Sequence, residues 1–233
     1  MKTLGLVLLV AVITTFCSNK TAADVVYSTL GPSDTFYTQS GDNIHGTLFT
    51  VPQTIGFQFP SQITGTLTTV EVAVFLQNPQ SAPGGTGDIN VSLHLNNPLT
   101  NLPLTGGIFL GSIVVASTIG TLVTITPSLP ISLTAGEEYW LVLSPGSNTT
   151  QASWCFGFNQ GTTFGAFSHD WGQTFTPFGG AASAFRINAA PVPEPSVFAL
   201  IGIGAILVCR RKRGTIKMHA RCSEATRLLL RSL

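Results

Sequence analysis

The sequence predicts an all-β protein, folded as a two-sheet jelly-roll-like sandwich, with an N-terminal signal peptide and a short C-terminal transmembrane helix. Three observations lead to this prediction. Short segments of alternating apolar and polar residues fill 24–190, and uncharged apolar runs stand near both ends of the sequence. Only 9% of the residues are charged, where about 25% is usual for a soluble protein.

The first 23 residues have the three parts of a secretory signal peptide. A positive start precedes an apolar run from Leu4 to Phe16, and small residues precede a cut after Ala23. This run is shorter than the roughly 20 residues that a membrane-spanning helix needs. Cys17 leaves a lipoprotein signal as an alternative, although Phe16 is bulky where lipoprotein signals need a small residue.

Apolar residues at every second position identify two strands within 24–190. In Ile89 to Leu95 the apolar odd-numbered residues share one face and the polar even-numbered ones share the other. In the second strand, Val70, Val72, Val74 and Leu76 share one face. Further strands are expected at 55–59, 109–115, 122–125, 139–143, 154–158 and 185–188.

Clusters of Gly, Pro, Ser and Asn separate these segments, at 81–88, 134–136 and 144–148. The same part of the sequence has no sustained 3.6-residue apolar period and no repeat of fixed length. Many short strands with such turns favour a β-sandwich or a closed barrel. Of these two we choose the sandwich.

Charge is segregated along the sequence. Residues 24–190 carry one basic residue, Arg186, against eight acidic residues, a net charge of −7, whereas 210–233 carries a net charge of +7. An acidic domain is not expected to bind nucleic acid, because phosphate groups require Lys and Arg. The same domain has one cysteine, Cys155, so its stability must come from an apolar core and not from an internal disulfide.

Residues 191–213 combine a proline-rich linker, an apolar run and a basic cluster. As a helix, the run Val197 to Cys209 extends only about 20 Å, against about 30 Å of membrane hydrocarbon. It fits a marginal permanent anchor, a segment that is later removed, or a buried core helix. The basic cluster argues against the core helix and places 24–190 outside the cytoplasm. Its residues are Arg210, Arg211, Lys212 and Arg213.

In this order, the linker Val192 to Ser196, the apolar run and the basic cluster resemble the PEP-CTERM sorting signal. The resemblance implies a bacterium that makes extracellular polysaccharide, and an exosortase-type processing enzyme as partner. It also implies that Pro193, Glu194 and Pro195 are recognition residues and that the chain is membrane-anchored before processing. Proteins of this pattern usually end soon after the basic cluster, so 214–233 is either a cytoplasmic extension or a reading-frame artefact.

Two short segments in the middle of the sequence resemble the "choice-of-anchor" outer domains, especially the R type. They are Ile131 to Pro145 and Ala184 to Asn188. This resemblance implies exposure at the cell surface and no established activity.

Candidate catalytic and metal-binding residues are few. His169 and Asp170 form the only adjacent His–carboxylate pair, and catalysis would need a nucleophile beside them. Glu137 and Glu138 are expected on opposite faces of a strand, and His45 and His94 are expected to face solvent. We therefore assign no catalytic residue, metal or cofactor. Calcium ligation is the alternative to turn geometry for Asp34, Asp42 and Asp88.

The three tryptophans divide into two groups. Trp140 and Trp154 lie on expected strands, where aromatic side chains are more often part of the core. Trp171 lies between Asp170 and Gly172 and is the best candidate for an exposed ligand contact.

The sequence thus predicts an exported, non-enzymatic protein of the bacterial cell surface or extracellular matrix. Residues 24–190 would be the extracellular domain, 191–213 the sorting segment and 214–233 a basic tail. The first alternative is an extracellular carbohydrate-binding module, with polysaccharide as its partner. The second alternative is a secreted hydrolase.

Overall fold

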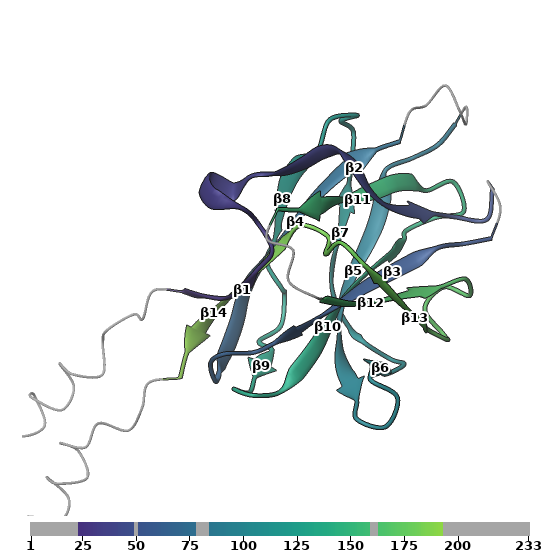
Figure 1. Ribbon diagram of the computed structural model, residues 1–233. Helices are drawn as coiled ribbons and strands as arrows, with labels where there is room; N and C mark the ends of the chain where they lie inside the picture. Colours follow the sequence, from purple (N-terminus) through teal and green to yellow (C-terminus); the bar gives the residue numbers. More distant parts are fainter. Residues whose placement is uncertain (1–22, 49–50, 78–83, 159–162, 193–233) are drawn as a thin grey trace, which may run out of the picture. The chain divides into compact units, whose positions relative to one another are not determined.

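The computed structural model describes residues 23–48, 51–77, 84–158 and 163–192, which form two antiparallel β-sheets (Figure 1). The predicted signal peptide and transmembrane helix lie outside these residues. The described part contains one short 3₁₀ turn, η1 (Pro32–Asp34), and no helix that is long and apolar enough to cross a membrane. The predicted all-β, two-sheet sandwich is confirmed, and its jelly-roll-like character stays a prediction.

Sheet A is built around its longest strand, β4. In spatial order it contains β1 (Asp24–Ser28), β14 (Phe185–Pro191), β4 (Gly65–Leu76), β11 (Gln151–Gly157) and β2 (Phe36–His45). Two short strands, β8 (Thr121–Ile125) and β9 (Ser132–Leu133), also pair with β4.

Sheet B has a similar arrangement around β10 and β5. In spatial order it contains β13 (Thr176–Gly180), β12 (Thr163–Ser168), β3 (Thr54–Pro60), β10 (Glu138–Pro145), β5 (Asp88–Asn97) and β6 (Leu102–Pro103). The strand β7 (Ile108–Val114) pairs with β5 as well. The chain crosses repeatedly from one sheet to the other, so neighbours in sequence face each other across the core.

The apolar core lies between the two sheets and follows the alternation read from the sequence. The alternate residues Val70, Val72 and Val74 of β4 and Ile89, Val91 and Leu93 of β5 are buried in this core. The next residue in the β5 series, Leu95, lies 58% exposed at the end of the sandwich. All six expected strands outside these two are also present. The sequence pattern did not identify β1, β2, β6, β9, β12 and β13.

The outer face of sheet A carries a second, smaller cluster. Leu30, Ala73, Cys155 and Ala184 are buried there, beneath the segment that contains η1. Burial raises the pKa of the Cys155 thiol to about 12, so the thiolate is not accessible at neutral pH. The segment before β2 therefore covers part of the sheet instead of extending into solvent.

Arg186 fixes this covering segment electrostatically. It lies on the outer side of β14, directly opposite Glu71 of β4, and its Nε is 2.8 Å from Glu71 Oε2. Its second terminal nitrogen lies 2.5 Å from Asp34 Oδ1 in η1. These are close ion contacts, and their angles are not those of hydrogen bonds. The sole basic residue of 24–190 thus joins two strands to the covering segment.

Asp42 is an inward-facing carboxylate on the edge strand β2. It lies opposite Trp154 in the register with β11, and directly opposed residues share a face of a sheet. Ser183 Oγ donates a hydrogen bond to Asp42 Oδ2 at 3.1 Å. Burial raises the pKa of Asp42 to about 6, and the hydrogen bond from Ser183 opposes this shift less strongly. An inward charge on an edge strand also discourages pairing with other chains.

Arg186→Met is expected to lower the free energy of unfolding by about 2–4 kcal/mol, because it leaves the largely buried Glu71 carboxylate without a cation. Asp34→Asn is the matched control. It removes the more exposed partner, which is 54% accessible, and is expected to cost less than about 1 kcal/mol. Urea unfolding measures both. Equal losses in the two variants would contradict this account of the contacts.

Asp42→Asn is expected to stabilise the protein at pH 8 by on the order of 1–3 kcal/mol. The folded-state pKa lies above the ordinary value, so the ionised carboxylate opposes folding above about pH 6. The gain should shrink as the pH falls below 6 and be small near pH 4, where the folded aspartate is protonated and the unfolded one, with an ordinary pKa of 3.8, is partly protonated. Urea unfolding at pH 8, 6 and 4 tests this, with the exposed Asp24→Asn as control. A variant less stable than wild type at pH 8 would disprove it.

Candidate functional site

The loop between β12 and β13 is organised by Asp170. Its Oδ1 accepts hydrogen bonds from Ser168 Oγ at 2.6 Å and from the Thr174 backbone N–H at 2.8 Å. Its Oδ2 accepts one from Thr174 Oγ1 at 2.6 Å. These bonds, with Ser168 first, hold the pKa of Asp170 well below its ordinary value. The carboxylate therefore fixes the loop as an anion.

The Asp170 loop presents Trp171 to solvent. Trp171 is 40% exposed, as predicted, whereas Trp140 and Trp154 are fully buried, also as predicted. Trp171 has φ = 63° and the following Gly172 has φ = 85°. A left-handed backbone is uncommon for a bulky residue and persists only where its surroundings enforce it. Here the hydrogen bonds to Asp170 enforce it.

His169 and Asp170 do not act on each other. His169 Nδ1 donates to the Pro52 carbonyl at 3.2 Å, and its ring lies against Phe167 at 5.0 Å. Asp170 is engaged with Ser168, Thr174 and the backbone of Gln173. No hydrogen bond joins the two neighbours in the part of the chain that the structure describes. His169 and Asp170 therefore contact different parts of the domain and do not form a catalytic dyad.

The expectation that His94 faces solvent is wrong. His94 is only 8% exposed, because Phe175 of the Asp170 loop packs edge-on against its ring, with the ring centroids 6.1 Å apart. Its Nδ1 donates to the Leu104 carbonyl at 2.7 Å, so Nε2 of the neutral ring accepts from Ser92 Oγ at 2.9 Å. Burial lowers the pKa of His94, and the Leu104 bond opposes this shift less strongly. His94 is a neutral, packed residue.

Four polar side chains meet on the outer face of sheet B, and sequence reasoning did not find them together. We call Gln58, Asn96, Asn101 and Glu138 the amide–carboxylate cluster. Gln58 Nε2 donates to Asn101 Oδ1 at 2.7 Å and to Glu138 Oε2 at 2.5 Å. Asn96 Nδ2 donates to the same two oxygens at 2.9 and 3.2 Å.

A buried side chain supports the amide–carboxylate cluster from below. Trp140 Nε1 donates to Asn96 Oδ1 at 2.8 Å, and Trp140 itself is fully buried. Glu137 and Glu138 were expected on opposite faces of a strand. Glu138 joins the cluster, and Glu137 makes no hydrogen bond with it among the described residues. The signal that the sequence offers for this site is weak, because its members are separated by up to 80 positions.

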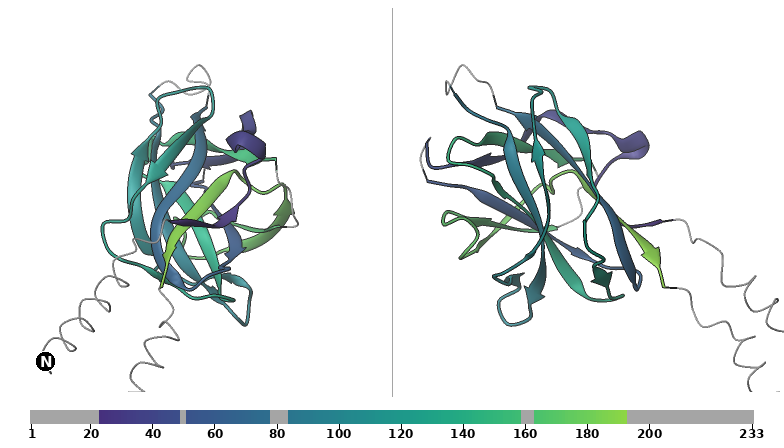
Figure 2. Two further views of the ribbon diagram at one scale, coloured as in Figure 1. Left: turned by 90° about the vertical axis from the view of Figure 1, so that its left-hand side faces the viewer. Right: turned by 180° about the vertical axis from the view of Figure 1, so that it is seen from behind.

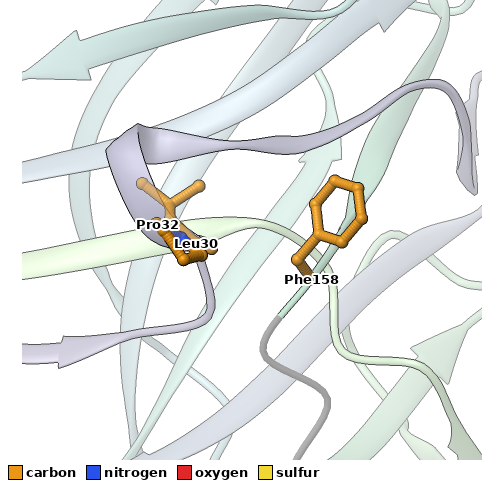
Figure 3. Close-up of a pocket in the computed structure, with 4 residues that line it drawn as sticks. Leu30, Pro32 and Phe158 are labelled. Atoms are coloured by element: carbon orange, nitrogen blue, oxygen red, sulfur yellow. The ribbon is translucent and has the colours of Figure 1, made fainter.

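A shallow pocket lies on the other side of the domain, beside η1. Leu30 and Pro32 face Phe158 across it, and Gly31 completes its lining (Figure 3). Its volume is about 380 Å³. The Phe158 ring stacks on Tyr37 at 4.3 Å, and both rings are exposed to solvent, at 47% and 43%. None of its four lining residues has a charged side chain.

The three aspartates considered for calcium lie in different places. Asp34 is in η1 beside Arg186, Asp42 faces the core from β2, and Asp88 begins β5. Among the described residues no three His, Cys, Asp or Glu side chains gather closely enough to bind a metal ion.

The predicted sorting residues Pro193, Glu194 and Pro195 and the basic cluster lie outside the described residues, which end at Val192. Ala23, the expected signal cleavage residue, directly precedes β1. A search of curated proteins finds no match to this chain. Residues 191–213 match the family described as the PEP-CTERM protein-sorting motif. The motif supports export, sorting through the C-terminal segment, and processing by exosortase after membrane anchoring.

Proposed function

We propose that this chain is a non-enzymatic protein of the bacterial cell surface or extracellular matrix, and that its β-sandwich is the delivered domain. The observation that carries the proposal is the PEP-CTERM match at 191–213. The match begins at Pro191, the last residue of β14. The sorting segment therefore follows the sandwich directly, with no intervening domain.

The chemistry of the described residues supports a non-enzymatic role. Two histidines make structural contacts. His94 lies under Phe175, and His169 donates a hydrogen bond to the Pro52 carbonyl. Asp170 serves to fix its loop. The resemblance of 131–145 and 184–188 to choice-of-anchor domains points the same way and rests on sequence alone.

The mature protein is expected to lack the C-terminal segment that contains Arg213, because exosortase-type processing occurs near Pro193, Glu194 and Pro195. Intact-mass spectrometry of the surface fraction measures this. Glu194→Ala should leave the C-terminal segment attached. Pro191→Ala, which changes a proline just outside the recognition triplet, is the control and should be processed like wild type. A wild-type protein that keeps Arg213 would contradict the proposal.

A second function, carbohydrate binding, is favoured by one observation. The exposed Trp171 is fixed in a left-handed backbone by a loop with many hydrogen bonds. Strained, over-determined residues occur often at ligand sites, and an indole ring presents an apolar face together with an N–H donor. A sugar ring stacks on such a face. We propose extracellular polysaccharide as the ligand of this alternative.

Trp171→Ala is expected to weaken retention on an extracellular polysaccharide by about ten-fold, since one aromatic contact contributes on the order of 1–1.5 kcal/mol. Retention on polysaccharide purified from the producing strain is the measurement. Phe164→Ala is the matched control, because Phe164 is a more exposed aromatic residue on β12, at 57%. Equal retention of wild type and the Trp171 variant would remove the basis of this function.

A further inference from the structure

The amide–carboxylate cluster presents three polar atoms that the protein itself leaves unused. Gln58 Oε1, Glu138 Oε1 and Asn101 Nδ2 make no hydrogen bond within the described residues, whereas their companion atoms make two each. Gln58 is only 8% exposed, so its free oxygen belongs to an otherwise buried side chain. Two acceptors and one donor are thus available at one place on the surface.

These free groups have fixed positions, unlike most exposed polar side chains. Each of the four residues is restrained by at least two hydrogen bonds within the cluster, and Asn96 is also bonded to the buried Trp140. Asn101 has a left-handed backbone, φ = 53°. Fixing side chains before binding reduces the rotamer entropy that a ligand must overcome, which is the usual property of a preorganised site.

The chemistry of the free atoms selects a neutral ligand rich in hydroxyl groups. Each hydroxyl can donate to Gln58 Oε1 or Glu138 Oε1 and accept from Asn101 Nδ2. A calcium ion needs six to eight oxygen ligands, and here the other cluster oxygens already accept N–H donors. An anionic ligand would meet the Glu138 carboxylate on a domain of net charge −7.

The amide–carboxylate cluster and Trp171 lie at opposite ends of the same outer side of β3. Gln58 lies near one end of β3. Thr54 begins the strand at the other end, where it pairs with Ser168 just before the Asp170 loop. The two positions are about 13 Å apart along an extended strand. A Cβ on Gly172 would lie 3.8 Å from Thr54 Cγ2, which places the loop over that end. This spacing suits a chain of sugar units better than a single small polyol.

We propose that Gln58, Asn101 and Glu138 form a hydroxyl-binding subsite for a neutral polysaccharide, with Asn96 as a positioning residue. The inference rests on the carbohydrate-binding function above and adds a second contact to it. It is distinct from Trp171 and can fail while Trp171 still binds.

Affinity gel electrophoresis of the full chain, purified in a detergent without a sugar head group, tests the subsite. The probes are dextran, xylan, galactomannan and pullulan. Glu138→Gln keeps an oxygen that accepts from Gln58 and Asn96, but it replaces the free carboxylate oxygen, Oε1, by an amide N–H donor. Asn101→Asp makes the opposite change, and Asp tolerates the left-handed backbone. Glu137→Gln, the same charge change one residue away, is the control.

At least one probe should retard the wild type, with about ten-fold weaker binding in both cluster variants and unchanged binding in the control. No retardation by any probe would overturn the inference. Unchanged binding of Glu138→Gln and Asn101→Asp would also overturn it, and if Trp171→Ala still loses binding, the carbohydrate function survives without this subsite. Binding abolished by EDTA would overturn it in favour of a cation site. Thermal unfolding checks that each variant is folded.

Discussion

The burial of one apolar face of each sheet is the interaction on which this domain depends. With a single cysteine in 24–190, the domain has no internal disulfide to restrain its unfolded chain. Strand β4 connects the sheet to the core: it pairs with β14, β11, β8 and β9, and its alternate valines face sheet B. A polar substitution on that face would disturb both sheets at once.

The outer faces of the sandwich are used differently from its interior. On sheet A, one arginine joins two strands to a covering segment, so a domain almost devoid of basic residues places its one cation where two acids meet. On sheet B, the Asp170 loop covers Trp140 and His94 and exposes Trp171. The outer sides therefore carry the ion contacts and the amide–carboxylate cluster, and the inner sides carry the main apolar core.

Strands β4 and β5 could be predicted because each places an apolar residue at every second position on a buried face. Strands β2 and β13 were missed since they lie at sheet edges, bury little, and so lack the pattern. The exposure of Trp171 followed from its turn neighbours. The burial of His94 and the meeting of Gln58 with Glu138 did not, because both depend on contacts between segments distant in the sequence.

The place of the last strand has a mechanical consequence. Strand β14 lies between β1 and β4, and Asp24 at the start of β1 pairs with Ala189, so both ends of the domain leave sheet A together (Figures 1 and 2). A pull on whatever is attached after Val192 runs along β14, perpendicular to its hydrogen bonds with two neighbours. Those bonds would have to shear together instead of opening one by one. The arrangement of the last strand therefore favours resistance to unfolding by a force applied after Val192.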